Sequence, residues 1–290
     1  MQTLASILVL TALYSLFGIG YVIIYRASRL LNLAHGEMMM LGGYFFFTLA
    51  TSFPMLSYLI IPITLVICAL LGILIYRLSI KPMAGHPIFA AVLVTIGLGI
   101  LIRGISILLW TSRTRYPLTV VGIKNEPIQM LPGVVLSTFD ILTLIGAGAV
   151  FLAFFLFIKF TKFGIQMRAA AEKPLLAALR GIDYNWVFAV SWGLATFTGS
   201  FAGILYASNV RLDPTIAILG LKAFSVAVVG GLDSFRGVFP GAAMVATGEI
   251  LAIFYISPLM SDIAPFVLLL IMLLIRPWGL FGTKEELERV

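Results

Sequence analysis

Three ionisable side chains, Arg103, Lys222 and Glu249, lie inside mostly apolar stretches, where a charge requires a specific reason. Placing such a group at the centre of a bilayer costs roughly 2.5–3.5 kcal/mol, so each should face the protein interior and find a partner. For Arg103 and Lys222, toward the outer halves of their segments, we favour a structural role over contact with a charged substrate: either a buried ion pair or a side chain that extends toward the membrane interface. For Glu249, near the middle of its run, the two roles are about equally compatible with the sequence.

A second polar group precedes a helix of small residues in the segment NLAHGEMMMLGGY, residues 32–44. Asn32 opens a polar turn, and Gly42 permits close packing against a neighbouring helix. Glu37 should lie in the first helical turn, where the helix dipole favours an acid. This capping role is enough to explain why an acid occurs at position 37. His35 could titrate near neutral pH, but a single histidine of this kind usually serves as a hydrogen-bonding group.

A third group is the polar turn in GGLDSFRGVFPG, residues 230–241, which joins two glycine-rich apolar pieces. It begins with Gly230 and Gly231 and contains Asp233. Non-helical backbone at membrane depth must be buried in protein or line a water-filled cavity, and segments interrupted by Gly and Pro point to a transport pathway. A polar turn before a small-residue helix also occurs at 32–44, which is a weak indication of an internal repeat.

Two connections between apolar runs are long enough to have structure of their own. The connection 159–184 contains Pro174, which can open a short helix, and Gly181, which fits the end of one. It is either a helix pair that docks in a groove of another protein or a basic loop that fixes the topology. The connection 111–137 is either a small extracytoplasmic hairpin or cap, with short alternating stretches such as 118–123, or an irregular linker.

Motifs for catalysis or nucleotide binding are missing from the sequence. Its single cysteine, Cys68, excludes an intrachain disulfide and a cysteine-based metal site. The two histidines, His35 and His86, are not at metal-ligand spacing. There is no phosphate-binding Gly-x4-Gly-Lys-Ser/Thr loop, Gly-x-Ser-x-Gly or His-Glu-x-x-His motif. Energy for any pumping must therefore come from an ion gradient or from another subunit.

The elements that carry these groups must be membrane-spanning helices. Of 290 residues, 61% are hydrophobic and only 11% charged, whereas soluble domains carry about 25% charged residues. This excludes a soluble enzyme, a nucleic-acid-binding protein and a disordered protein, and predicts one all-helical polytopic domain in a lipid bilayer. We expect about eight or nine spans, with a short or broken helix near 216–231. The others are predicted at 4–24, 36–53, 58–76, 88–110, 138–158, 185–207, 238–256 and 262–275.

The distribution of Lys and Arg predicts the orientation of these spans. With the N-terminus outside and 216–231 crossing, thirteen basic residues fall in inner loops and four in outer loops. This bias places the N-terminus outside the cytoplasm and the C-terminus inside. No basic residue precedes the first apolar run, so we interpret it as a retained span and not as a signal peptide.

Five stretches in order resemble one family: residues 32–44, 94–104 (VTIGLGILIRG), 163–183 (FGIQMRAAAEKPLLAALRGID), 220–250 and 276–282 (RPWGLFG). Over residues 10–283 the chain is similar to the LivH-type permeases of bacterial branched-chain amino acid ABC importers. The resemblance implies an inner-membrane permease with a related LivM-type permease, two cytoplasmic ATPase subunits and a periplasmic binding protein as partners. ATP and Mg²⁺ would bind to the ATPases, and this chain would carry no cofactor.

The resemblance also assigns candidate functional residues. The stretch 163–183 becomes the segment that docks in an ATPase groove, with Gly164, Arg168, Glu172, Lys173, Arg180, Gly181 and Asp183 as candidates. Candidates for the pathway or gate are Asn32, His35, Glu37, Gly42, Thr95, Arg103, Lys222, Gly230, Gly231, Asp233 and Glu249. Asp233 and Arg236 stand where relatives often have small or neutral residues, so the resemblance identifies the family without singling out one substrate.

Three alternatives remain at this stage. Relatives of the family carry urea, short amides or aromatic acids in place of Leu, Ile and Val. A stand-alone secondary transporter or channel would be driven by a gradient through Glu249. A membrane-embedded enzyme would use His35 and Glu37.

Overall fold

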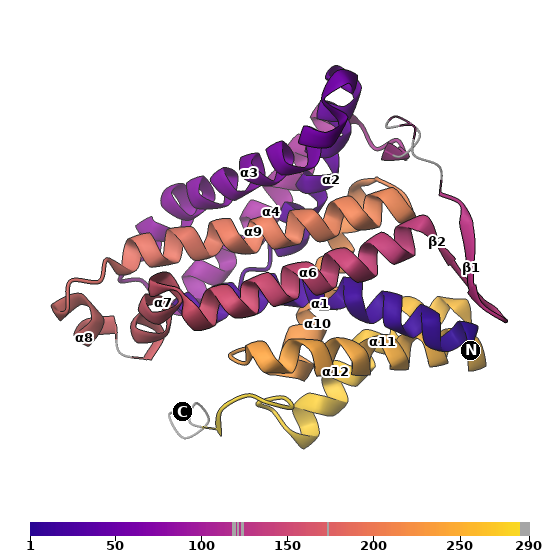
Figure 1. The fold of residues 1–290 in the computed structure, drawn as a ribbon. Helices are drawn as coiled ribbons and strands as arrows, with labels where there is room; N and C mark the ends of the chain where they lie inside the picture. Colours follow the sequence, from indigo (N-terminus) through magenta and orange to yellow (C-terminus); the bar gives the residue numbers. More distant parts are fainter. Residues whose placement is uncertain (118–119, 121, 123–124, 173, 285–290) are drawn as a thin grey trace.

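The structure is a computed structural model that describes residues 1–117, 120, 122, 125–172 and 174–284. Long helices lie side by side in one elongated bundle (Figure 1). The N-terminus and a two-stranded hairpin lie at one end, which we call the hairpin end. The short helices α7 and α8 lie at the other end, together with the C-terminal segment, and we call it the α7–α8 end.

The helices follow the apolar runs of the sequence. Their bounds are α1 Gln2–Ser28, α2 His35–Ser52, α3 Ser57–Ile75, α4 Ile88–Trp110, α6 Thr138–Phe160, α7 Lys162–Glu172, α8 Pro174–Leu179, α9 Tyr184–Asn209, α10 Ile218–Gly230, α11 Val238–Tyr255 and α12 Ala264–Ile275. Within the described residues, six helices are long and apolar enough to cross a membrane by length and composition, and shorter apolar helices accompany them. The predicted all-helical polytopic fold is confirmed.

Helix α10 is the short helix predicted near 216–231. Its 13 residues span about 20 Å, less than the roughly 30 Å of a hydrocarbon core. A 3₁₀ helix, Pro214–Ala217, precedes it. Before that, Leu212 forms an antiparallel bridge with Arg115, in the same connection as the hairpin. The 3₁₀ helix extends α10 to a continuous apolar helical stretch, Pro214–Gly230, of 17 residues.

The connection 111–137 contains the hairpin. Strands β1 (Pro127–Leu131) and β2 (Val134–Ser137) are antiparallel, whereas 118–119, 121 and 123–124 lie outside the described residues. The side-chain amide of Gln2 accepts a hydrogen bond from the N–H of Val135 at 2.8 Å and donates one to its carbonyl at 2.9 Å. The hairpin is thereby joined to the start of α1.

Small residues bring α2 and α9 into backbone contact. A Cβ on Gly42 would lie 2.5 Å from the Cα of Ser200, and one on Gly203 would overlap the carbonyl oxygen of Met39. The hydroxyl of Ser200 donates to the Met38 carbonyl at 3.3 Å. Because lipid tails are as apolar as the helices, such close packing is a main source of helix association in membranes.

Gly203→Ala is therefore expected to destabilise the protein by roughly 1–3 kcal/mol, since an added methyl group in a well-packed interior forces the backbones apart. Gly97→Ala is the matched control, because a Cβ there meets no atom within 4 Å. Thermal unfolding of the purified variants in detergent measures both. An unchanged Tm for Gly203→Ala would contradict the close packing of α2 on α9.

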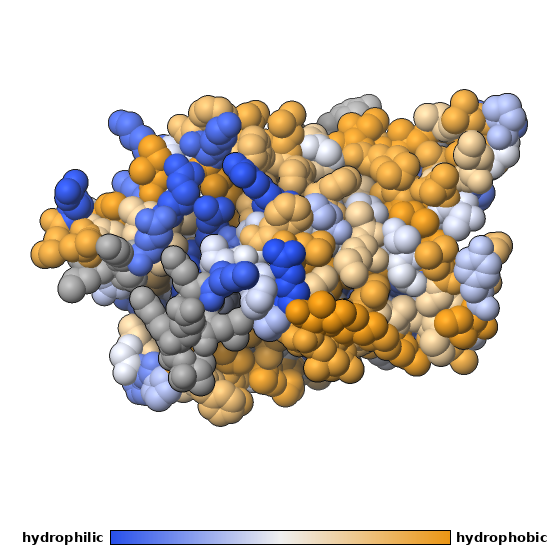
Figure 2. Space-filling model, turned by 90° about the horizontal axis from the view of Figure 1, so that it is seen from below, coloured by the Kyte–Doolittle hydropathy of each residue, from blue (hydrophilic) through white to orange (hydrophobic). Residues whose placement is uncertain are grey.

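Apolar side chains cover much of the outer surface. Figure 2 shows them over most of one face, with hydrophilic residues gathered toward the α7–α8 end. Leu108 on α4 is 84% exposed and Leu274 on α12 is 77% exposed. In water such a surface would aggregate, whereas a bilayer solvates it.

Candidate functional site

Helix α2 begins inside the bundle. A Cβ on Gly20, well inside α1, would overlap the imidazole of His35, and one on Gly36 would overlap the carbonyl oxygen of Ala217. The His35 ring is fully buried and stands edge-on to Tyr21, with ring centroids 4.7 Å apart. The imidazole is therefore shielded from any substrate in this conformation and packs α2 against α1.

The non-helical residues before α2 are held by side chains of two segments. The Asn32 side-chain oxygen accepts a hydrogen bond from the N–H of Ala34 at 3.1 Å. The Thr95 hydroxyl on α4 accepts one from the N–H of Leu33, also at 3.1 Å. Because unpaired backbone groups are costly in a membrane, Asn32 and Thr95 stabilise the connection between α1 and α2. Both had been predicted as pathway residues, and the structure gives each a local structural contact.

Arg103 forms an ion pair with Glu37, the acid in the first turn of α2. Arg103 Nη2 lies 2.6 Å from Glu37 Oε1; the Arg103 side chain is 42% exposed and that of Glu37 is 9% exposed. Gly99 on α4 makes room for the carboxylate, since a Cβ there would lie 3.1 Å from it. The favoured ion pair of Arg103 is present, and its guanidinium remains partly open to the surroundings.

Lys222 and Glu249 form a second, more deeply buried pair. Lys222 Nζ lies 3.1 Å from Glu249 Oε1, with the two side chains 7% and 6% exposed. The hydroxyl of Tyr14 on α1 donates a hydrogen bond to Glu249 Oε2. Asp262, which is 78% exposed, lies 3.1 Å from the same ammonium group. This network joins α1, α10 and α11 to the 3₁₀ helix Pro258–Asp262.

Tyr14 and Asp262 had no role in the sequence interpretation. Tyr14 is one aromatic residue in a continuous apolar run, so no local pattern distinguishes it. Asp262 stands at the edge of the last run and could have been noticed as a possible partner of Lys222. Among the described residues, no group of three or more His, Cys, Asp or Glu converges on a metal-sized site.

The glycine-rich turn at 230–234 lies at the α7–α8 end and binds the C-terminal segment. Asp233 accepts hydrogen bonds from Thr283, at 3.2 Å from its N–H and 2.5 Å from its hydroxyl. The carbonyl of Gly230 accepts from the N–H of Phe281 at 3.1 Å. Gly231, with φ of 107°, adopts a conformation that favours glycine. These contacts give the turn a structural role, and its role in a pathway stays a prediction.

Helix α7 is fixed to the end of α6 through one carbonyl group, that of Ile158. A Cβ on Gly164 would overlap this oxygen, and Arg168 Nη1 donates a hydrogen bond to it. On the same helix Met167 and Ala170 are buried. Helix α7 therefore packs directly on the end of α6.

Helix α8 projects further from the bundle. Ala177 is buried, whereas Leu176 is 51% and Leu179 77% exposed. Gly181, with φ of 80°, follows the helix, and Arg180 is exposed. The segment thus presents apolar side chains beyond the ends of the long helices, and neither Leu176 nor Leu179 was among the residues predicted to dock.

The remaining coupling candidates flank α8. Glu172 is exposed at the last turn of α7. Asp183 caps α9, where its side chain accepts hydrogen bonds from the N–H groups of Asn185 at 2.9 Å and Trp186 at 3.2 Å. Lys173 lies outside the described residues.

A family model described as "Branched-chain amino acid transport system / permease component" matches residues 3–275. The chain belongs to this permease family. The permease is similar to the high-affinity branched-chain amino acid transport system permease protein BraD of Pseudomonas aeruginosa, with 28% identity over 100% of this chain and 98% of the relative. It is also similar to the corresponding LivH protein of Salmonella typhimurium, with 28% identity over 100% and 97%.

A more distant relative is the probable branched-chain amino acid transport permease protein LivH of Methanocaldococcus jannaschii, 24% identical over 99% of the permease and 94% of the relative. The family resemblance read from the five sequence stretches is confirmed. The permease is thus a multi-pass membrane component of a transport system.

Proposed function

We propose that the permease is a transmembrane subunit of an ATP-driven importer that moves Leu, Ile and Val across a bacterial inner membrane. Its partners are a related LivM-type permease, two cytoplasmic ATPase subunits that bind ATP and Mg²⁺, and a periplasmic binding protein that delivers the substrate. The permease itself is non-catalytic and binds no cofactor. The names of its relatives support the substrate, and the excess of Lys and Arg in the inner loops supports a cytoplasmic C-terminus.

The observation that carries the proposal is the arrangement of α7 and α8. Exposed Leu176 and Leu179 on α8 are suited to a groove in another protein, because apolar side chains exposed together often mark a surface that binds a partner. Helix α7 is in turn fixed to α6 through Gly164 and Arg168. An ATPase that binds α8 and changes shape would therefore move α7 together with α6.

Reconstitution distinguishes a transporter subunit from a protein that transports on its own. Proteoliposomes with the permease, its partner permease and both ATPases should take up labelled leucine only with internal ATP and the binding protein. The permease alone should take up none. Uptake by the permease alone, driven by an ion gradient, would contradict the proposal and would favour a secondary transporter. Competition by urea, short amides or aromatic acids identifies the substrate class.

Leu179→Glu should weaken retention of the ATPases by about tenfold or more, because it places a charge in a desolvated contact. Co-purification through a tag on the permease measures the retention. Leu131→Glu is the matched control, since Leu131 is also exposed, at 64%, but lies on β1 at the hairpin end. Equal retention in both variants would contradict docking through α8.

A further inference from the structure

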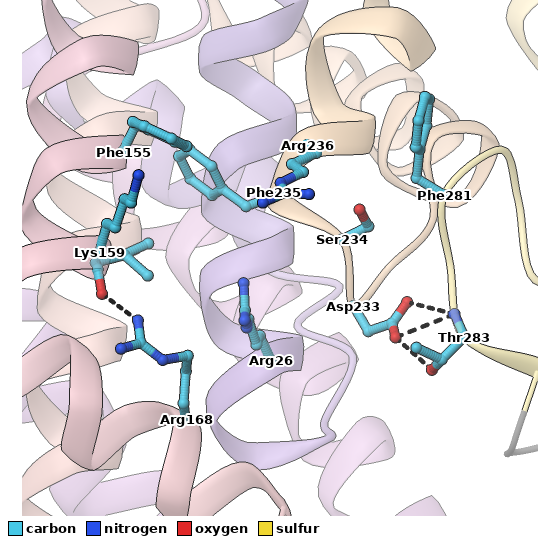
Figure 3. A pocket seen from close by; sticks show the side chains of 11 residues that line it. Arg26, Phe155, Lys159, Arg168, Asp233, Ser234, Phe235, Arg236, Phe281 and Thr283 are labelled. Carbon is cyan, nitrogen blue, oxygen red and sulfur yellow. Dashed lines mark hydrogen bonds between the residues drawn. The ribbon is translucent and has the colours of Figure 1, made fainter.

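A cavity of about 480 Å³ opens at the α7–α8 end, between α1, α6, α7 and the turn before α11. Four basic side chains line it, as Figure 3 shows: Arg26, Lys159, Arg168 and Arg236. The acid in its lining, Asp233, accepts hydrogen bonds from Thr283. The cavity is therefore strongly positive, which favours an anionic ligand.

The basic side chains come from different elements and converge without carboxylate partners. Among the described residues, none of the four lies within 4.0 Å of an acidic oxygen; the ion pairs present are elsewhere. Lys159 Nζ lies 5.6 Å from the ring centre of Phe155, and Arg168 donates one hydrogen bond to the Ile158 carbonyl. Most of their donor groups remain available, and guanidinium groups bind phosphate oxygens in a favourable paired geometry.

An apolar groove of about 460 Å³ adjoins this cavity. It lies between α1, α6 and α11, and Phe155 lines both spaces. Along α6 the groove extends from Leu144 to Phe155, about 16 Å at the rise of a helix. Its lining is almost entirely aliphatic and aromatic, and Leu8, Leu152 and Phe239 in it are more than half exposed. A ligand that fills both spaces needs a negative head and an extended hydrocarbon chain.

We infer that the cavity and the groove together bind an anionic phospholipid, with its phosphate among the four basic side chains and one acyl chain along α6. Basic pockets between transmembrane helices on the cytoplasmic side are typical sites for anionic headgroups. A free phosphate or an acidic protein segment would satisfy the basic cavity but would leave the apolar groove empty. The headgroup would contact Arg168, so the lipid would also hold α7 against α6.

The site is tested by lipid titration of the purified permease in detergent, followed by native mass spectrometry. Phosphatidylglycerol should bind roughly tenfold or more tightly than phosphatidylcholine with the same acyl chains, because each basic side chain adds attraction for net negative charge. Inorganic phosphate should not compete at lipid concentrations. Competition by inorganic phosphate at those concentrations would assign the cavity to a free anion and would overturn the inference.

Two variants separate the headgroup from the acyl chain. The double substitution Lys159→Gln/Arg236→Gln should remove the preference for phosphatidylglycerol. The control is Arg77→Gln/Lys81→Gln, because both residues lie outside the cavity; this variant should keep the preference. Gly148→Leu should weaken both lipids severalfold, since Gly148 lines the groove and a side chain there enters open space.

Gly104→Leu is the control for the groove variant, because Gly104 is equally open but lies on α4. The inference would be overturned if the double variant still preferred phosphatidylglycerol. It would also be overturned if Gly148→Leu and Gly104→Leu bound the lipids equally well. Loss of bound lipid on assembly with the partner permease would overturn it as well, because the groove would then be part of a protein interface.

Discussion

Glu249→Gln should destabilise the permease by up to about 3–5 kcal/mol, the cost when removal of one member of a buried ion pair leaves its partner uncompensated. The substitution leaves the Lys222 ammonium, 7% exposed, with Asp262 as its remaining acid within 4.0 Å among the described residues. It also replaces the charged acceptor of the Tyr14 hydroxyl by a neutral amide. The expected result is a large fall in the Tm of the detergent-purified protein and in its yield from membranes.

Asp262→Asn is the matched control, because this carboxylate is 78% exposed and exposed pairs contribute only about 0–1 kcal/mol. The double variant Lys222→Met/Glu249→Met should regain part of the lost stability, since it leaves no unpaired charge in the interior. If Glu249→Gln abolished uptake without lowering the Tm, the carboxylate would have a transport role in place of the structural role.

Gly164→Ala should reduce ATP-dependent leucine uptake by about tenfold or more while ATP hydrolysis continues, since a misplacement of about 1 Å can cost a hundredfold in a finely positioned system. The added methyl group overlaps the Ile158 carbonyl and displaces α7 from α6. Uptake and hydrolysis in the same proteoliposomes measure the coupling, and this result depends on the proposed function. Gln166→Ala, on the same helix and only partly buried, is the control and should transport normally.

Arg168→Ala and Glu172→Ala should also uncouple hydrolysis from uptake while leaving the affinity for the binding protein intact, but for different reasons. Arg168 holds α7 on α6 through the Ile158 carbonyl, so its loss should also lower the Tm. Glu172 is exposed, so its loss should leave the Tm unchanged. Wild-type coupling in both variants would contradict the role of the segment 163–183 in coupling to the ATPases.

The helices could be predicted because the bilayer imposes a simple rule on sequence. Continuous apolar runs must become helices of spanning length, and each predicted run is a helix with ends close to those expected. Helix α10 was identified as short for the same reason. The ion pairs could not be predicted from the positions of the charged residues along the chain. Arg103 and Glu37 are 66 positions apart, and nothing local to either residue identifies the other.

Contacts between distant segments account for the rest. The sequence presents Asp233 as a polar residue in a possible pathway, but its partner is Thr283, 50 positions later. Likewise, the polar turn at 32–34 gave no indication that α2 starts beside the interior of α1. In the segment 159–184, Pro174 and Gly181 were compatible with a helix pair but left a basic loop as the alternative, whereas the role of Ile158 as a shared acceptor for α7 required the three-dimensional structure.

The contact between Gly36 and Gly220 restricts the conformational cycle. Each of these glycines lies directly on the backbone of the other helix. No side chain stands between them that could change its rotamer to accommodate a displacement. Separating α2 from α10 would remove the packing of these backbone groups inside the hydrocarbon region of the membrane. Helices α2 and α10 should therefore move as one rigid unit, and a crosslink introduced between them should leave transport intact.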